Sequence, residues 1–129
     1  MGLRLTLKPH ERAIIGGAVI RNGEHRVELL IENEVPLLRE SDILSPGAVR
    51  TPCERIYLAL QLIYVDPTRI SEHQATFRAL VSDVRSAAPS CEPFIEKIED
   101  YVRGGNLYQA IKSTQDLLNY ERKLMEHAA

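Results

Sequence analysis

Residues able to carry out covalent or metal chemistry are few in this sequence, and their spacing matches no catalytic or metal-binding pattern. The histidines at positions 10, 25, 73 and 127 are scattered, with no pair at HxxxH or HExxH spacing, so we expect no zinc site. His73 falls on the apolar face of a predicted helix, which favours a hydrogen-bonded core histidine over a ligand. No glycine-rich phosphate loop of the GxxxxGK[ST] or GxGxxG type follows a predicted strand, so we expect neither an enzyme nor a cofactor.

The two cysteines, Cys53 and Cys91, lie far apart and outside any CxxC spacing. Each falls near a predicted helix start, where we interpret it as a small buried apolar residue and not as a nucleophile. Two free thiols are typical of a reducing compartment, so we expect the bacterial cytoplasm. No signal peptide and no apolar run near 18 residues is present, which predicts no membrane association.

Basic residues in the first half are the remaining candidates for binding chemistry. The formal net charge of the 129 residues is −2, so any anion site must come from local clustering. Cross-strand pairing can gather dispersed side chains at one edge of a sheet, and the planar fork of arginine suits phosphates and guanine edges. The residues concerned are Lys8, Arg12, Arg21, Arg26 and Arg39. In the alternative interpretation they only pair with nearby Glu11, Glu24, Glu28 and Glu40 and keep the surface hydrated.

The elements that must position these cations are short strands. Leu3–Leu7 alternates with period two, and residues 12–20 continue with β-branched side chains around a bend at Gly16-Gly17. Asn22-Gly23 predicts a two-residue hairpin turn, followed by a returning strand over residues 25–31. A last strand over residues 35–40 contains Pro36, which places it at a sheet edge.

After residue 50 the apolar period becomes helical. Thr51 and Glu54 form a predicted capping box with Pro52 at the first helical position, and Asp66-Pro67 repeats the signal for a second helix. Ser90 and Asn106 are predicted caps of a third and a fourth helix, with Gly104-Gly105 between them. The sequence therefore predicts an α+β fold: a small antiparallel β-rich half, residues 1–50, followed by a four-helix half, residues 51–129.

The first predicted helix, residues 53–65, is apolar on nearly all sides. One small sheet cannot cover two apolar stripes, so we expect this helix to contribute to a homodimer or to a partner interface. The expected interface residues are Ile56, Tyr57, Leu60, Ile63 and Tyr64.

Several stretches resemble the FlbT family of bacterial flagellar regulators along nearly the whole chain. They are Asn22-Gly23, "LLRESDIL", "TPCERIYLALQLIYVDP" and "GNLYQAIKSTQDLLNYERKLM". The resemblance implies a non-enzymatic regulator that binds the 5′ untranslated leader of flagellin mRNA and alters its translation and lifetime, in either direction. It also implies other flagellar regulators, including a small FlaF-type protein, as partner candidates.

The first half also resembles, more distantly, the carbon storage regulator family, through "LRLTLKPHERAIIGG" and "EVPLLRESDI". Members of that family grip RNA loops between the first and the last strand. This resemblance implies a site on residues 5–8 and 37–40, with Lys8 opposite Arg39, although Leu7 stands where that family has a basic residue. Together with the basic residues above, the predicted RNA-binding set is Leu5, Lys8, Arg12, Arg26, Leu37 and Arg39.

Two functions therefore follow from the sequence. The first is a post-transcriptional regulator of flagellin synthesis that holds the mRNA leader on its β-rich half. The second is a protein-interaction adaptor in flagellar assembly, which binds a regulator, a chaperone or flagellin through its helices and affects the mRNA only indirectly.

Overall fold

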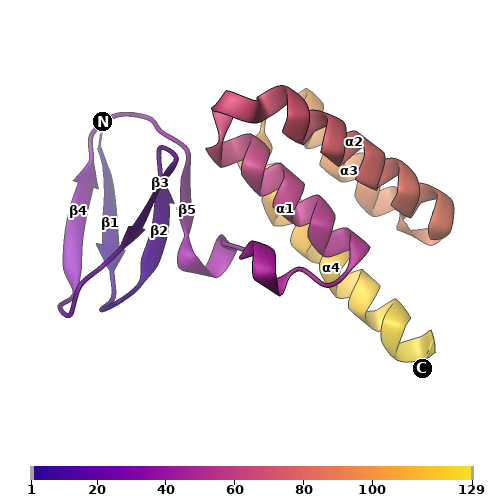
Figure 1. Cartoon of the computed structure of the whole chain (residues 1–129), viewed down its shortest axis with the longest axis horizontal. Coiled ribbons are helices and arrows are strands. Elements are labelled where there is room, and N and C mark those ends of the chain that lie inside the picture. Colours follow the sequence, from indigo (N-terminus) through magenta and orange to yellow (C-terminus); the bar gives the residue numbers. More distant parts are fainter. Residues whose placement is uncertain (1, 129) are drawn as a thin grey trace. The chain divides into compact units, whose positions relative to one another are not determined.

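The computed structural model describes residues 2–128, which form two compact units that divide between Ile43 and Leu44 (Figure 1). The division lies earlier than the expected boundary at residue 50. The reason is local: the side-chain amide of Gln61 donates to the Leu44 carbonyl (3.0 Å) and accepts from the Leu44 amide (2.8 Å). These two bonds fasten the segment after residue 43 to the first helix.

The β unit, residues 2–43, contains five antiparallel strands, as the sequence predicts (Figure 1). β1 pairs only with β4, whereas β2 lies between β3 and β5 in a second sheet. β5 is therefore an edge strand, in the position that Pro36 predicts. The strands are β1 (Leu3–Leu7), β2 (Arg12–Ile15), β3 (Ala18–Arg21), β4 (Val27–Ile31) and β5 (Leu37–Arg39), and a short 3-10 turn (Glu40–Asp42) follows.

The two small sheets share one core. Leu5 and Leu7 of β1 pack with Ala13 of β2, and partly buried side chains from β2, β4 and β5 complete the cluster. Period two explains the selection, because alternate residues of each strand point to the same face. This shared core gives each sheet the apolar partner that a few strands alone lack.

The predicted hairpin at Asn22-Gly23 is wrong. β3 and β4 belong to different sheets, so residues 22–26 cross between sheets and do not turn back within one. The two-residue hairpin turn lies instead at Gly16 and Gly17, between β2 and β3, where both residues have positive φ (59° and 89°). Glycine adopts such angles without steric cost, which explains why this dipeptide makes the turn.

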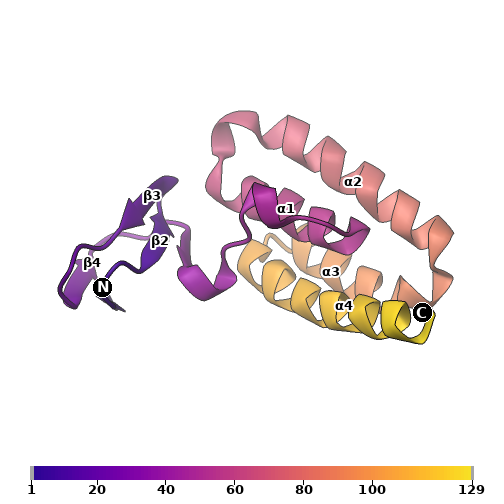
Figure 2. The same cartoon turned by 60° about the horizontal axis from the view of Figure 1, so that its bottom comes forward.

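The helical unit, residues 44–128, contains four helices, in agreement with the sequence (Figure 2). Its α1 packs against α2 and α4, and α3 packs against α4. Within residues 2–128, no helix is both long and apolar enough to cross a bilayer. The helices are α1 (Pro52–Val65), α2 (Ile70–Ala87), α3 (Glu92–Arg103) and α4 (Leu107–Ala128), with short 3-10 turns at Pro46–Ala48, Pro67–Arg69 and Pro89–Cys91.

Helix starts agree with the sequence in two cases and differ in two. At the start of α4 the Gln109 amide donates to Asn106 Oδ1 (3.4 Å), as the predicted cap requires. The Thr51 hydroxyl accepts from the Glu54 amide (3.1 Å) and Glu54 Oε1 accepts from the Thr51 amide (3.0 Å), which confirms the capping box. Asp66 caps no helix: its carboxylate accepts from Thr68 Oγ1 (2.6 Å) and contacts His73 Nε2 (3.0 Å). Ser90 lies in a 3-10 turn before α3 and makes no side-chain cap. In both differing cases a proline-initiated 3-10 turn precedes the helix and displaces the expected cap.

Candidate nucleic-acid interface

Antiparallel topology brings most cations of the β unit to one end. The register pairs Leu7 with Val27, Arg12 with Arg21 and Ala13 with Arg39, so β1, β3 and β5 finish where β2 and β4 begin. Five of the six lysines and arginines within residues 1–43 occupy these junctions, and the sixth, Arg4, lies near the start of β1. We call this set the basic end; it consists of Lys8, Arg12, Arg21, Arg26 and Arg39.

The loops of the basic end are tied together by one asparagine. Asn22 Nδ2 donates to the carbonyls of Lys8 (2.9 Å) and His25 (2.9 Å), and the Asn22 amide donates to the Glu11 carbonyl (2.8 Å). The His10 amide donates to the Gly23 carbonyl (2.9 Å). These bonds join the β1–β2 turn to the β3–β4 crossing, so the cations on both segments are held on a defined scaffold.

The β1–β2 turn exposes Lys8, Pro9 and His10. The Glu11 amide donates to the Lys8 carbonyl (3.1 Å), and His10 has φ of 63°. Proline followed by a residue of positive φ is the geometry of a type II turn. The Lys8 amide also donates to Glu11 Oε1 (2.8 Å), so this carboxylate is engaged with the backbone of the turn.

Two arginines lie directly opposite each other at the basic end. Arg12 on β2 and Arg21 on β3 are register partners, an arrangement that costs free energy unless an anion compensates the two charges. Glu40 compensates one of them, accepting from Arg12 Nε (3.4 Å). Arg21 Nη1 donates to the His10 carbonyl (3.0 Å), which satisfies a donor without neutralising the charge.

Arg39 ends β5 and reaches the other sheet, where its Nη2 donates to the Thr6 carbonyl of β1 (2.8 Å). β5 pairs with β2 and not with β1, so Lys8 does not face Arg39 across paired strands as the sequence comparison implies. Both side chains are nevertheless exposed at the basic end. Among residues 2–128, no carboxylate lies within 4.0 Å of the charged groups of Lys8, Arg21, Arg26 or Arg39.

Two residues of the predicted RNA-binding set lie elsewhere. Leu5 is buried and Leu37 is half-buried, and both belong to the core cluster between the sheets. Their side chains pack in this cluster, on the face that alternate residues of each strand share. The other four members, Lys8, Arg12, Arg26 and Arg39, lie at the basic end.

The predicted interface on the first helix is mostly core. Ile56, Tyr57, Leu60 and Ile63 are buried within the helical unit, because α2 and α4 cover opposite sides of α1. Tyr64 is half-buried, with its ring 6.3 Å from that of Tyr108. Most of the two apolar stripes is therefore covered inside one chain, and Tyr64 is the member of the predicted set that stays half-buried.

Cys53 and Cys91 are both buried free thiols. Burial, followed by the hydrogen bond and charge of Glu121, raises the pKa of the Cys53 thiol, and burial followed by the same carboxylate raises the pKa of Cys91. A thiol that holds its proton is a poor nucleophile. No three metal-ligating side chains of residues 2–128 gather at one point.

Comparison with known proteins assigns the sequence to one family. The family model described as "Flagellar protein FlbT" matches residues 3–125. The chain belongs to the FlbT family. No solved structure matches it.

Curated FlbT relatives are similar to the chain over nearly its whole length. It is 46% identical over 125 residues to "Probable flagellum biosynthesis repressor protein FlbT 1" of Bradyrhizobium diazoefficiens, covering 96% of this chain and 85% of the relative. The corresponding Rhodopseudomonas palustris protein is 37% identical, with 97% and 98% covered. "Flagellum biosynthesis repressor protein FlbT" of Caulobacter vibrioides is 29% identical, with 100% and 93% covered.

Sequence reasoning missed the role of strand ends. Arg21 was grouped with the other cations but not with the site, although its position at the end of β3 places it opposite Arg12. The strand ends carry this pattern, since chain direction alternates from strand to strand and every second junction falls at the same end of the unit. Asn22 carried a different signal, that of a hairpin, and only the three-dimensional structure shows its bridging role.

Proposed function

We propose that this protein regulates flagellin synthesis after transcription, by binding the 5′ untranslated leader of flagellin mRNA at the basic end of the β unit. Family membership supports the flagellar context, and the relatives' names describe repressors of flagellum biosynthesis. One observation carries the binding proposal: five cations share one end of a small rigid unit, and four of them have no carboxylate partner among the described residues.

The chemistry of the basic end suits single-stranded or looped RNA. Proteins read such RNA by hydrogen bonds to base edges together with contacts to phosphates. The guanidinium of Arg39 supplies a planar fork for a base edge or a phosphate, and Lys8 and Arg26 supply charge on neighbouring loops. A phosphate near Arg21 also compensates the repulsion between the facing arginines.

Binding by this route is strongly electrostatic. Each neutralised phosphate releases counterions, so affinity falls steeply as salt rises. A chain with a net charge of −2 gains nothing from its overall charge, and all of the salt dependence must come from the basic end. The bound protein then covers a ribosome site or changes exposure to nucleases, which alters translation and lifetime of the message.

The test removes the side chain of Arg39, the cation at the basic end whose contact is best defined. Arg39→Ala is expected to weaken binding to a flagellin leader RNA by about 1–3 kcal/mol, because one charge and its paired donors are lost. Fluorescence anisotropy over a salt series, with a scrambled RNA alongside, measures both affinity and salt slope.

Arg4→Ala is the matched control, since it removes the same charge at the other end of the β unit, where Arg4 lies 3.5 Å from Glu28 on an exposed surface. We expect this variant to bind the leader RNA as the unchanged protein does. Equal affinity of both variants, or no preference for the leader over the scrambled RNA, refutes the proposal and favours an adaptor that contacts only proteins.

A further inference from the structure

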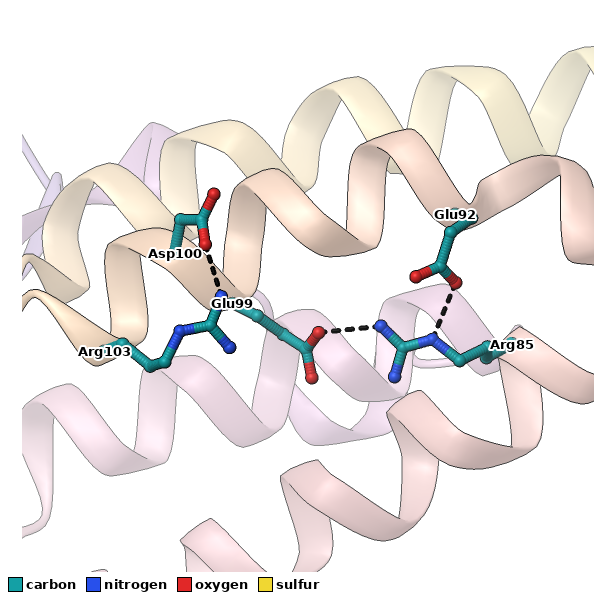
Figure 3. A network of polar contacts seen from close by, with 5 residues as sticks. All are labelled: Arg85, Glu92, Glu99, Asp100 and Arg103. Atoms are coloured by element: carbon teal, nitrogen blue, oxygen red, sulfur yellow. Dashed lines mark hydrogen bonds and ion pairs between the residues drawn. The ribbon is translucent and has the colours of Figure 1, made fainter.

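One side of the helical unit is open. α2 and α3 are consecutive helices joined by a short turn, yet they contact each other far less than α1 contacts α2 or α3 contacts α4. Near their joined ends Arg85 of α2 bridges to α3, with Nε 2.6 Å from Glu92 and Nη2 2.7 Å from Glu99 (Figure 3). Beyond this bridge, toward the start of α2 and the end of α3, the helices leave a groove.

The groove has a cavity of about 430 Å³ and an apolar floor. Phe77 and Ile63 form its buried part, and Ile70 at the start of α2 keeps 39% of its surface exposed. Val102 and Leu107 complete the apolar lining from the end of α3 and the start of α4. An exposed groove of this composition favours an apolar occupant.

The rim of the groove carries positive charge. Arg103 is paired with Asp100 on its own helix, and Glu99 is engaged by Arg85 (Figure 3). Arg78, which also lines the groove, has no carboxylate within 4.0 Å among residues 2–128. The groove is therefore matched to apolar side chains that are followed by a carboxylate.

The last turns of α4 have that composition. Met125 keeps 57% of its surface exposed, and Leu124, which also lines a small pocket of its own unit with Cys53 and Val84, keeps 37%. Glu126 follows them, is exposed, and has no cationic partner among the described residues. One molecule thus presents both an apolar groove with an arginine that has no carboxylate partner and a partly exposed apolar segment with a carboxylate that has no cationic partner among the described residues.

We propose that two copies of this chain associate by exchanging these features, with Leu124 and Met125 of each copy in the α2–α3 groove of the other and Glu126 facing Arg78. The groove includes Leu107 at the start of α4, and Met125 lies about 27 Å further along the helix at 1.5 Å per residue. An antiparallel two-fold arrangement therefore makes both contacts at once and leaves no open groove for further growth.

Charge exchange tests the pairing of Glu126 with Arg78. Arg78→Glu and Glu126→Arg are each expected to raise the dimer dissociation constant at least about tenfold, because every changed contact occurs twice in a two-fold dimer. The double variant restores an opposite pair and is expected to return the constant close to that of the unchanged protein. Sedimentation velocity of the full chain over a concentration series measures the constant.

Matched controls carry the same charge changes on the exposed part of α3, away from the groove. Lys97→Glu and Glu96→Arg are expected to leave association unchanged, and Lys97→Glu is not expected to rescue Glu126→Arg. Met125→Asp, which places a charge in the apolar floor, is expected to give a monomer with unchanged helical circular dichroism. A monomer at high micromolar concentration, or single variants that weaken association without rescue by the double variant, overturns the proposal.

Discussion

The β unit and the helical unit stabilise themselves in different ways. The β unit has a small shared core, and many of its specific contacts are hydrogen bonds that fasten loops, such as those of Asn22. The helical unit also fastens its loops, for example through Gln61 and Arg50, but it buries whole helix faces as well, with Ile56 and Leu60 fully covered. The β unit displays cations without carboxylate partners on loops that hydrogen bonds fix, whereas the helical unit contains the larger set of buried apolar side chains.

This contrast explains why the sequence of the first helix suggests an interface with a second chain or a partner. Two apolar stripes on one helix indicate two covering surfaces, and the sequence alone does not say whether these belong to one chain or to two. In this structure both belong to the same chain, as α2 and α4. The α2–α3 groove, which we propose as the partner surface, lies between two helices that contact each other far less than α1 contacts α2 or α3 contacts α4.

The largest effect is expected from a substitution in the core of the helical unit. Leu60→Ala removes a fully buried side chain of α1, and we expect the free energy of unfolding to fall by about 2–5 kcal/mol, from lost burial and the cavity left behind. Urea unfolding followed by circular dichroism measures the change. Leader-RNA affinity, measured where the variant is still folded, is expected to stay unchanged because the basic end belongs to the other unit.

Leu30→Ala is the control for Leu60→Ala. It truncates a leucine that is largely exposed on β4, so we expect a change within about 0.5 kcal/mol. If both truncations lower the free energy of unfolding by the same amount, the importance assigned to the buried face of α1 is contradicted.

A smaller effect is expected from the loss of the cap at the start of α1. Thr51→Ala removes the hydroxyl that accepts from the Glu54 amide, and we expect a loss of about 1 kcal/mol in unfolding free energy. Ser90→Ala, before α3, is the matched control, because Ser90 makes no cap and its loss is expected to change little. Thermal unfolding of both variants is the measurement, and an equal loss in the two contradicts the assigned cap.

The smallest effect concerns the thiols, both of which lie in the helical unit. Burial raises the pKa of Cys53 and Cys91, so the folded protein holds these protons to higher pH than the unfolded chain does. Stability is therefore undiminished below the ordinary thiol pKa of about 8.5 and declines as the pH rises past it.

Labelling with a disulfide reagent at pH 8 tests directly whether the two thiols are buried. We expect slow reaction in buffer and complete reaction of both thiols in urea. Fast labelling of the native protein refutes the burial of Cys53 and Cys91, and with it the close packing assigned to this unit. A Cys91→Ala variant separates the two sites.

Much of the fold was predictable because local signals and tertiary structure agree. Thr51 and Glu54 predict a cap that the structure contains, and period-two residues such as Leu5 and Leu7 face the core. The sequence alone does not reveal that Asn22-Gly23 forms no hairpin, because only long-range strand pairing assigns β3 and β4 to different sheets. Leu5 and Leu37 enter the predicted RNA-binding set through the resemblance to the carbon storage regulator family, and strand alternation alone does not say which face of a strand is buried.

The uneven distribution of charge along the β unit has a consequence for the kinetics of encounter. The five cations share their end with Glu11, Glu24, Glu40 and Asp42, whereas Glu32 and Glu34 follow β4 at the other end, near Arg4. The unit therefore carries a weak dipole with its positive pole at the basic end, and its total charge is near zero. In the field of a polyanion such a dipole turns the cationic pole forward before contact, which raises the fraction of productive collisions. The association rate, more than the dissociation rate, is then the quantity that ionic strength controls.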